Sequence, residues 1–127
     1  MRSVKPDIIE TMSKVTIYHN PRCSKSRQTL ALLQEHGIEP EVVLYLQDPP
    51  DAKTLKRLLQ LLGMGPRELM RTKEAPYKEL GLKDEHLGED ALIDAMAANP
   101  VLIERPIVVK GSRAVLGRPP ENVLDLV

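Results

Sequence analysis

The sequence predicts a single α/β domain whose four-stranded mixed sheet is assembled from a βαβ half and a ββα half. Its first 46 residues pass from a β-rich run to helical periodicity and back to a second β-rich run. Towards the other end, two short apolar runs flank a Gly-Ser pair, which is typical of a hairpin. Residues 48–103 show only helical patterns, and 127 residues suit one domain, so we interpret this stretch as an insertion.

The βαβ half is predicted over residues 15–46. Residues 15–18 are β-rich, and Asn20-Pro21 ends this strand. The next segment has helical spacing from Ser24 and ends at a glycine, Gly37, which suits the C′ position. Residues 41–46 read as the second strand, so the crossover makes the two strands parallel.

The insertion is predicted to contain several short helices. The first follows Asp48-Pro49-Pro50-Asp51, because Asp is a good N-cap and Pro is tolerated in the first turn. Further helices are expected over residues 67–72, from Pro76, and over residues 89–98, each bounded by Gly, Pro or Asn.

The ββα half comprises strands over residues 106–110 and 113–116, joined by Gly111-Ser112 in a type II′ turn, and a helix over residues 121–127. This element order is that of a thioredoxin-like fold with an all-helical insertion. We therefore expect the hairpin to complete the sheet around the first strand. Residues 15–127 form the domain, and residues 1–14 are predicted to be a flexible N-terminal extension.

The composition weighs against several functions. The 18 basic and 18 acidic residues cancel, and Phe and Trp are absent, so neither nucleic acid nor a membrane surface is an expected partner. No segment resembles a signal peptide or approaches the roughly 18 apolar residues of a membrane span. One cysteine and 3 histidines give no metal-ligand spacing, so neither a metal nor a bound cofactor is expected, and the cysteine usage indicates a cytoplasmic protein.

The sole cysteine, Cys23, lies where the first strand turns into the first helix. A lone cysteine is often a small buried apolar side chain. A helix N-terminus, however, stabilises a thiolate and an anion beside it, and Arg22, Lys25 and Arg27 are close in sequence. Four residues earlier, His19 could act on the thiol as an imidazolium or make one structural hydrogen bond.

Residues 19–30, His-Asn-Pro-Arg-Cys-Ser-Lys-Ser-Arg-Gln-Thr-Leu, resemble the signature of the glutaredoxin-coupled arsenate reductase family, His-Asn-Pro-x-Cys-x-x-Ser-Arg-x-Thr-Leu. The charged residues around the cysteine resemble the YfgD-like branch of that family. The likeness continues through residues 42–46, 48–50, 69–71, 76–77, 104–109 and 117–119.

The resemblance implies roles for individual residues. Cys23 would be the nucleophile, His19 would tune it, and Ser26 would hydrogen-bond near the sulfur. The oxyanion would be held by the three arginines that match the family's set, which are Arg71, Arg105 and Arg118. Pro106 matches the cis-proline that faces the active cysteine in thioredoxin-like folds.

The implied reaction reduces arsenate to arsenite through a cysteine arseno-thioester. Glutathione is the implied co-substrate and glutaredoxin the implied source of reducing equivalents. The three arginines suit this reaction, because a thiolate that attacks an anion needs positive charge around it and guanidinium forks match oxyanions well. The alternative for each arginine is a solvated surface position, which we expect for Arg57, Arg67 and Arg113. Arg105 and Arg118 differ in directly preceding proline, which restricts the backbone.

Two other functions stay open. Ser26 stands where a Cys-x-x-Cys motif has its second cysteine, so an external thiol must resolve any adduct on Cys23. Spx-type regulators share the fold and bind RNA polymerase, and they typically use a Cys-x-x-Cys pair as a redox switch. Cys23 and Ser26 cannot form that switch. A related monothiol oxidoreductase with another substrate is the remaining alternative.

Overall fold

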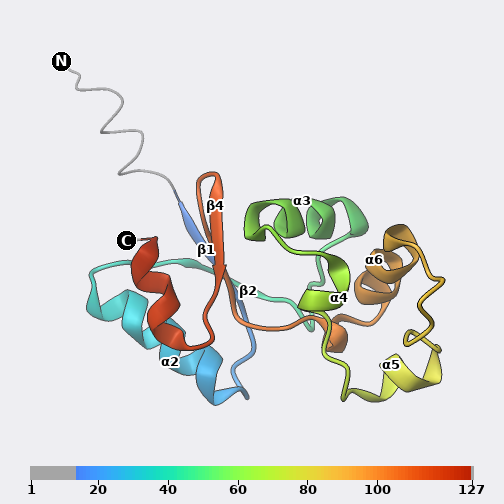
Figure 1. Ribbon diagram of the computed structural model, residues 1–127. Coiled ribbons are helices and arrows are strands. Elements are labelled where there is room, and N and C mark those ends of the chain that lie inside the picture. Colours follow the sequence, from blue (N-terminus) through green and yellow to red (C-terminus); the bar gives the residue numbers. More distant parts are fainter. Residues whose placement is uncertain (1–13, 127) are drawn as a thin grey trace.

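The computed structural model of the chain describes residues 14–126 and confirms the four-stranded mixed sheet. The strand order is β2-β1-β3-β4 (Figure 1), with β1 parallel to β2 and antiparallel to β3, and with β3 antiparallel to β4. The prediction of a flexible extension falls almost wholly on residues outside the described range. The strands are β1 (Val15–His19), β2 (Glu41–Leu44), β3 (Ile107–Lys110) and β4 (Arg113–Leu116).

The helical insertion also has the predicted place in the chain, between β2 and β3. The helices are α2 (Ser24–Glu35), α3 (Ala52–Leu62), α4 (Pro66–Leu69), α5 (Ala75–Glu79) and α6 (Glu89–Ala98), with the 3₁₀ helices η1 (Pro100–Leu102) and η2 (Pro120–Asp125). Asp51 caps α3 by accepting the backbone N–H of Thr54 at 2.8 Å, as its type predicts.

Three boundaries differ from the sequence prediction. The second strand ends at Leu44, because its carbonyl accepts the N–H groups of Gln47 and Asp48 in a turn. The helix expected over residues 67–72 is the single turn α4, and the chain then pairs with residues 102–104. The last helix is a 3₁₀ helix rather than an α-helix.

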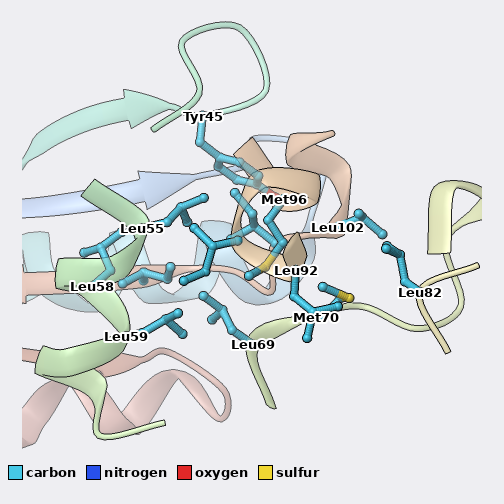
Figure 2. Close-up of a cluster of buried hydrophobic side chains, with 13 residues drawn as sticks. Tyr45, Leu55, Leu58, Leu59, Leu69, Met70, Leu82, Leu92, Met96 and Leu102 are labelled. Atoms are coloured by element: carbon cyan, nitrogen blue, oxygen red, sulfur yellow. The ribbon is translucent and has the colours of Figure 1, made fainter. Parts of the chain in front are cut away.

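The sheet carries one apolar core on each face. On one face α2 and η2 lie side by side against the sheet. Leu33 of α2 and Val123 of η2 belong to the same buried cluster as Ile17 of β1. On the other face the insertion packs on the sheet, and Figure 2 shows leucines of α3 meeting Leu92 and Met96 of α6. The sheet is therefore the middle of three layers (Figure 1).

The loops that carry the candidate site residues lie together at one end of the sheet. β1 and β2 end there side by side, with His19 opposite Leu44. β3 begins there, because it is antiparallel to β1, and β4 ends there. In open α/β sheets, ligands bind outside the carboxyl ends of strands such as β1 and β2.

The hairpin of β3 and β4 is extended at this end by Pro106 and Gly117. The N–H of Gly117 donates to the carbonyl of Pro106 at 2.9 Å. The Thr29 hydroxyl of α2 lies between two acceptors, the carbonyl oxygen of Lys25 at 2.8 Å and that of Gly117 at 3.1 Å. A Cβ atom on Gly117 would lie 2.6 Å from Thr29 Oγ1 and 2.8 Å from Pro106 Cγ. Only glycine allows this approach of the hairpin to α2.

We predict that Gly117→Ala lowers the free energy of unfolding by about 1–3 kcal/mol, the usual effect of overpacking a buried site. Urea unfolding of Gly117→Ala and of the wild type measures the difference. Equal stability of the two proteins would contradict the packing argument.

Candidate active site

Cys23 is the N-cap residue of α2 and begins that helix at this end of the sheet. Its backbone is extended, with φ −96° and ψ 123°, and its N–H donates to the carbonyl of Asn20 at 3.0 Å. The first turn of α2 contains no acidic residue. The residue is 9% exposed, so the thiol is largely shielded from solvent. This is the setting in which a helix N-terminus supports an anionic sulfur and an oxyanion beside it.

Arg105 and Arg118 face the same point because they continue the register of the hairpin. Ile107 pairs with Leu116, and the hydrogen bond between Pro106 and Gly117 extends that pairing by one residue. Arg105 and Arg118 are therefore the next pair of residues opposite each other. Both are followed by cis proline, as the resemblance implied for Pro106. Arg118 Nη1 lies 3.9 Å from the sulfur of Cys23. The structure therefore brings at least one predicted arginine directly to the predicted nucleophile.

Arg71 reaches this group by a different route. After α4 the chain forms a bridge between Met70 and Ile103, and the N–H of Arg71 donates to the carbonyl of Leu102 at 2.7 Å. This pairing places Arg71 beside Glu104, the residue before Arg105. Although the three arginines are far apart in sequence, they lie around one carboxylate.

Glu104 Oε1 is the atom on which the three arginines converge. It lies 3.8 Å from Arg71 Nε, 3.7 Å from Arg105 Nη1 and 3.8 Å from Arg118 Nε. Arg71 also pairs with Glu74, at 3.0 Å. The convergence that the sequence could not establish is thus present, and we name Arg71, Arg105, Arg118 and Glu104 the arginine cluster.

Arg105 is the most deeply placed member of the arginine cluster. Its side chain is 12% exposed, whereas that of Arg118 is 39% exposed. Within residues 14–126, its Nε and Nη1 atoms are buried and have no hydrogen-bond partner. Buried donors are almost always satisfied in folded proteins. Two unsatisfied N–H groups on a guanidinium indicate a place for an anionic acceptor.

His19 ends β1 and is buried at 5% exposure. Its Nδ1 atom lies 2.6 Å from Ser26 Oγ, and that oxygen also accepts the N–H of Asn20 at 3.0 Å. Burial lowers the pKa of His19, and the positive charge of Arg27 lowers that pKa further. These facts favour a neutral ring that makes a structural hydrogen bond over an imidazolium that acts on Cys23 by its charge.

Ser26 is fully buried in the first turn of α2. Among the described residues its hydroxyl is hydrogen-bonded to the ring of His19 and to the backbone N–H of Asn20. Ser26 therefore fixes the loop between β1 and α2, and it bears on Cys23 through the shape of that loop.

Two further residues of the site, Tyr45 and Glu104, were not predicted from the sequence. Tyr45 directly follows β2 and is 2% exposed. The pKa of Tyr45 is raised to about 12, chiefly by burial. The charge of Arg71 and a hydrogen bond with Asn20 lower this pKa, whereas the charges of Cys23 and Glu104 raise it. Its phenol is thus a neutral neighbour of the thiol and the arginine cluster. Their places in the sequence could have indicated both residues. Tyr45 directly follows a strand that is parallel to β1, and Glu104 directly precedes Arg105.

The arginines expected to be surface residues lie outside the arginine cluster. Arg57 and Arg113 are exposed, although Arg113 donates to the carbonyl of Asp125 at 2.8 Å. Arg67 is also exposed, but its guanidinium donates to the carbonyls of Leu82 and Asp84, so it braces the loop after α5. In residues 14–126 no helix has the length and apolar character to span a bilayer, and no acidic, His and Cys side chains form a metal-ligand group.

The fold and the site together define a thioredoxin-like protein with a single thiol at a helix N-terminus and an arginine cluster beside it. Residues 18–126 match the ArsC family. The chain belongs to this family, which confirms the resemblance read from the sequence.

Individual relatives agree with the family assignment. The uncharacterized protein YfgD of Escherichia coli (strain K12) is 64% identical over 115 residues, which cover 90% of this chain and 97% of YfgD. An arsenate reductase of Neisseria meningitidis serogroup A is 51% identical over 113 residues, covering 88% of this chain and 97% of that protein. The solved structure of an arsenate reductase from Vibrio cholerae has a TM-score of 0.88 and 56% identity, covering 91% of this chain and 98% of that one.

The lowered pKa of His19 gives a prediction about stability and pH. The unfolded chain takes up a proton on this histidine more readily than the folded chain, so the free energy of unfolding should fall as pH drops below about 6.5, the ordinary value. Above that pH the contribution is constant. Urea unfolding between about pH 5 and 7.5 should show this slope in the wild type and a smaller one in His19→Gln. The same slope in wild type and His19→Gln would contradict the assignment.

Proposed function

We propose that this protein is an arsenate reductase that uses glutathione and glutaredoxin as reductants. Support comes from membership of the ArsC family and from the arsenate reductases of Neisseria meningitidis and Vibrio cholerae among its similar proteins. The observation that carries the proposal is the pair of buried N–H groups on Arg105 without a partner among the described residues, next to the contact between Arg118 and Cys23.

The arginine cluster supplies what the first chemical step needs. Arsenate and a thiolate are both negative, so their approach requires donors that are held in place before the reaction. Arg105 offers Nε and Nη1, and Arg118 places Nη1 at 3.9 Å from the sulfur. A tetrahedral oxyanion held by these two groups would present its central atom to Cys23.

In the proposed step the sulfur of Cys23 attacks arsenic, an As–S bond forms, and one As–O bond breaks as its oxygen leaves as water after protonation. Reduction of As(V) to As(III) then needs two electrons. Two thiols supply them when they are oxidised to one disulfide. Cys23 is the only cysteine in the sequence, so the second thiol comes from glutathione, and glutaredoxin would return the enzyme to its starting state.

The two alternatives left open by the sequence receive less support. An interaction protein of the Spx type has no chemical need for a buried arginine with unsatisfied donors. A monothiol oxidoreductase acting on another oxyanion would use the same donors, and substrate comparison distinguishes it. Both alternatives share the fold, so the fold alone does not separate them.

We predict arsenate-dependent oxidation of NADPH in an assay that contains glutathione, glutathione reductase and glutaredoxin. Cys23→Ser should abolish this turnover, because the hydroxyl is a far weaker nucleophile than the thiolate. Ser24→Ala is the control, since Ser24 is exposed and adjacent in sequence. Absence of turnover with the wild type would overturn the proposal, and turnover with another oxyanion alone would favour the related oxidoreductase.

Arg105→Gln should lower kcat/KM for arsenate by about 10²–10³, the usual effect of removing one pre-positioned donor to an oxyanion. Arg57→Gln, which changes an exposed arginine on α3, should leave kcat/KM unchanged. Thermal unfolding checks that Arg105→Gln is folded. Unchanged kcat/KM in a folded Arg105→Gln protein would remove Arg105 from the site.

A further inference from the structure

Glu104 places a negative charge at the centre of a site that is otherwise suited to an anion. Its Oε1 atom lies 3.7–3.8 Å from a nitrogen of each of the three arginines. These separations exceed hydrogen-bond length, so the carboxylate offsets the positive charge without using the N–H donors. Within the part of the chain that the structure describes, two buried donors of Arg105 stay unpaired beside Glu104. The arginine cluster is therefore partly neutralised but still able to bind.

The backbone fixes the position of Glu104. Its N–H donates to the carbonyl of Leu69 at 2.8 Å, and its Oε1 accepts the N–H of Arg105 at 3.2 Å. It lines an open cavity of about 380 Å³ together with Arg71, Lys73 and Arg118. Glu104 is the acidic residue among the residues that line this cavity. An anion held in this cavity beside Arg71 and Arg118 would meet its carboxylate.

We propose that Glu104 is a selectivity residue, which admits tetrahedral oxyanions that carry a proton and rejects those that carry none. The inference rests on the proposed function, since it assigns the substrate class of the same site. An oxyanion bound to Arg105 and Arg118 lies against Oε1 of Glu104. A protonated oxygen there donates a hydrogen bond to the carboxylate, whereas an unprotonated oxygen meets a like charge.

Simple chemistry separates the candidate anions. Near neutral pH arsenate and phosphate still carry a proton, and sulfate carries none. Their size and shape are similar, so arginines alone discriminate poorly among them. A fixed carboxylate adds the repulsion that selectivity needs, because a bound sulfate offers Glu104 no proton and places its negatively charged oxygens beside the carboxylate.

The test measures binding without turnover. Calorimetry on a Cys23→Ser background gives the dissociation constants of arsenate, phosphate and sulfate at neutral pH and fixed ionic strength. We expect phosphate and arsenate to bind at least about tenfold more tightly than sulfate. Adding Glu104→Gln should tighten sulfate binding by about tenfold or more and reduce that preference. The glutamine keeps an acceptor for the Arg105 N–H.

Glu74→Gln is the matched control, because Glu74 pairs with Arg71 at 3.0 Å but is not shared by the other two arginines. It should leave the preference unchanged. Equal gains for sulfate and phosphate in Glu104→Gln would show a mere competing charge and overturn the proposal, as would no gain for either. If Glu104→Gln does not fold, equal binding of sulfate and phosphate without that substitution overturns it.

The outcomes separate this inference from the proposed function. Selective binding without arsenate turnover by the wild type would overturn the enzyme proposal and leave Glu104 as a selectivity residue. Arsenate turnover by a protein that binds sulfate as tightly as phosphate and arsenate would support the enzyme proposal and overturn the selectivity role of Glu104.

Discussion

The junction between Pro106 and Gly117 is the contact on which the site depends. The hydrogen bond between them extends the β3–β4 hairpin and sets Arg105 beside Arg118. The missing side chain of Gly117 lets this junction approach Thr29 on α2, the helix that Cys23 begins. One close contact therefore couples the position of Cys23 to those of two cationic groups. Because Pro106 and Gly117 directly adjoin β3 and β4, and Thr29 lies within α2, the sheet and α2 set the distances across the site.

The arginine cluster solves an electrostatic problem. Three guanidinium groups near one point repel one another, and burying the side chain of Arg105 removes most of its water. Glu104 offsets this repulsion from a distance that leaves the N–H donors unoccupied. A fully hydrogen-bonded carboxylate would have stabilised the cluster more and left less for a ligand. The geometry therefore balances folding against binding, as sites that hold unsatisfied groups must.

Local patterns were enough to predict the sheet, the place of the insertion and the setting of Cys23. The two-residue turn at Gly111 also determines the hairpin register, which in turn places Arg105 opposite Arg118, so this pair was within reach of sequence reasoning. The place of Arg71 could not be predicted in this way. It depends on the early end of α4 and on the pairing of Met70 with Ile103, a contact between distant segments that no periodicity encodes. The bonding of Ser26 to His19 likewise depends on burial, which its type does not reveal.

The external thiol of the proposed function has a structural reason beyond the count of cysteines. Ser26 occupies the place of a resolving cysteine, one helical turn beyond Cys23, yet its oxygen serves both the N–H of Asn20 and the ring of His19. A thiol at that fully buried position would accept these hydrogen bonds only weakly, so the turn between β1 and α2 would lose the groups that hold it. The loop that presents Cys23 is thus built on a hydroxyl. A second cysteine at position 26 would weaken the structure that positions the first, and this constraint directs the chemistry towards a thiol from outside the chain.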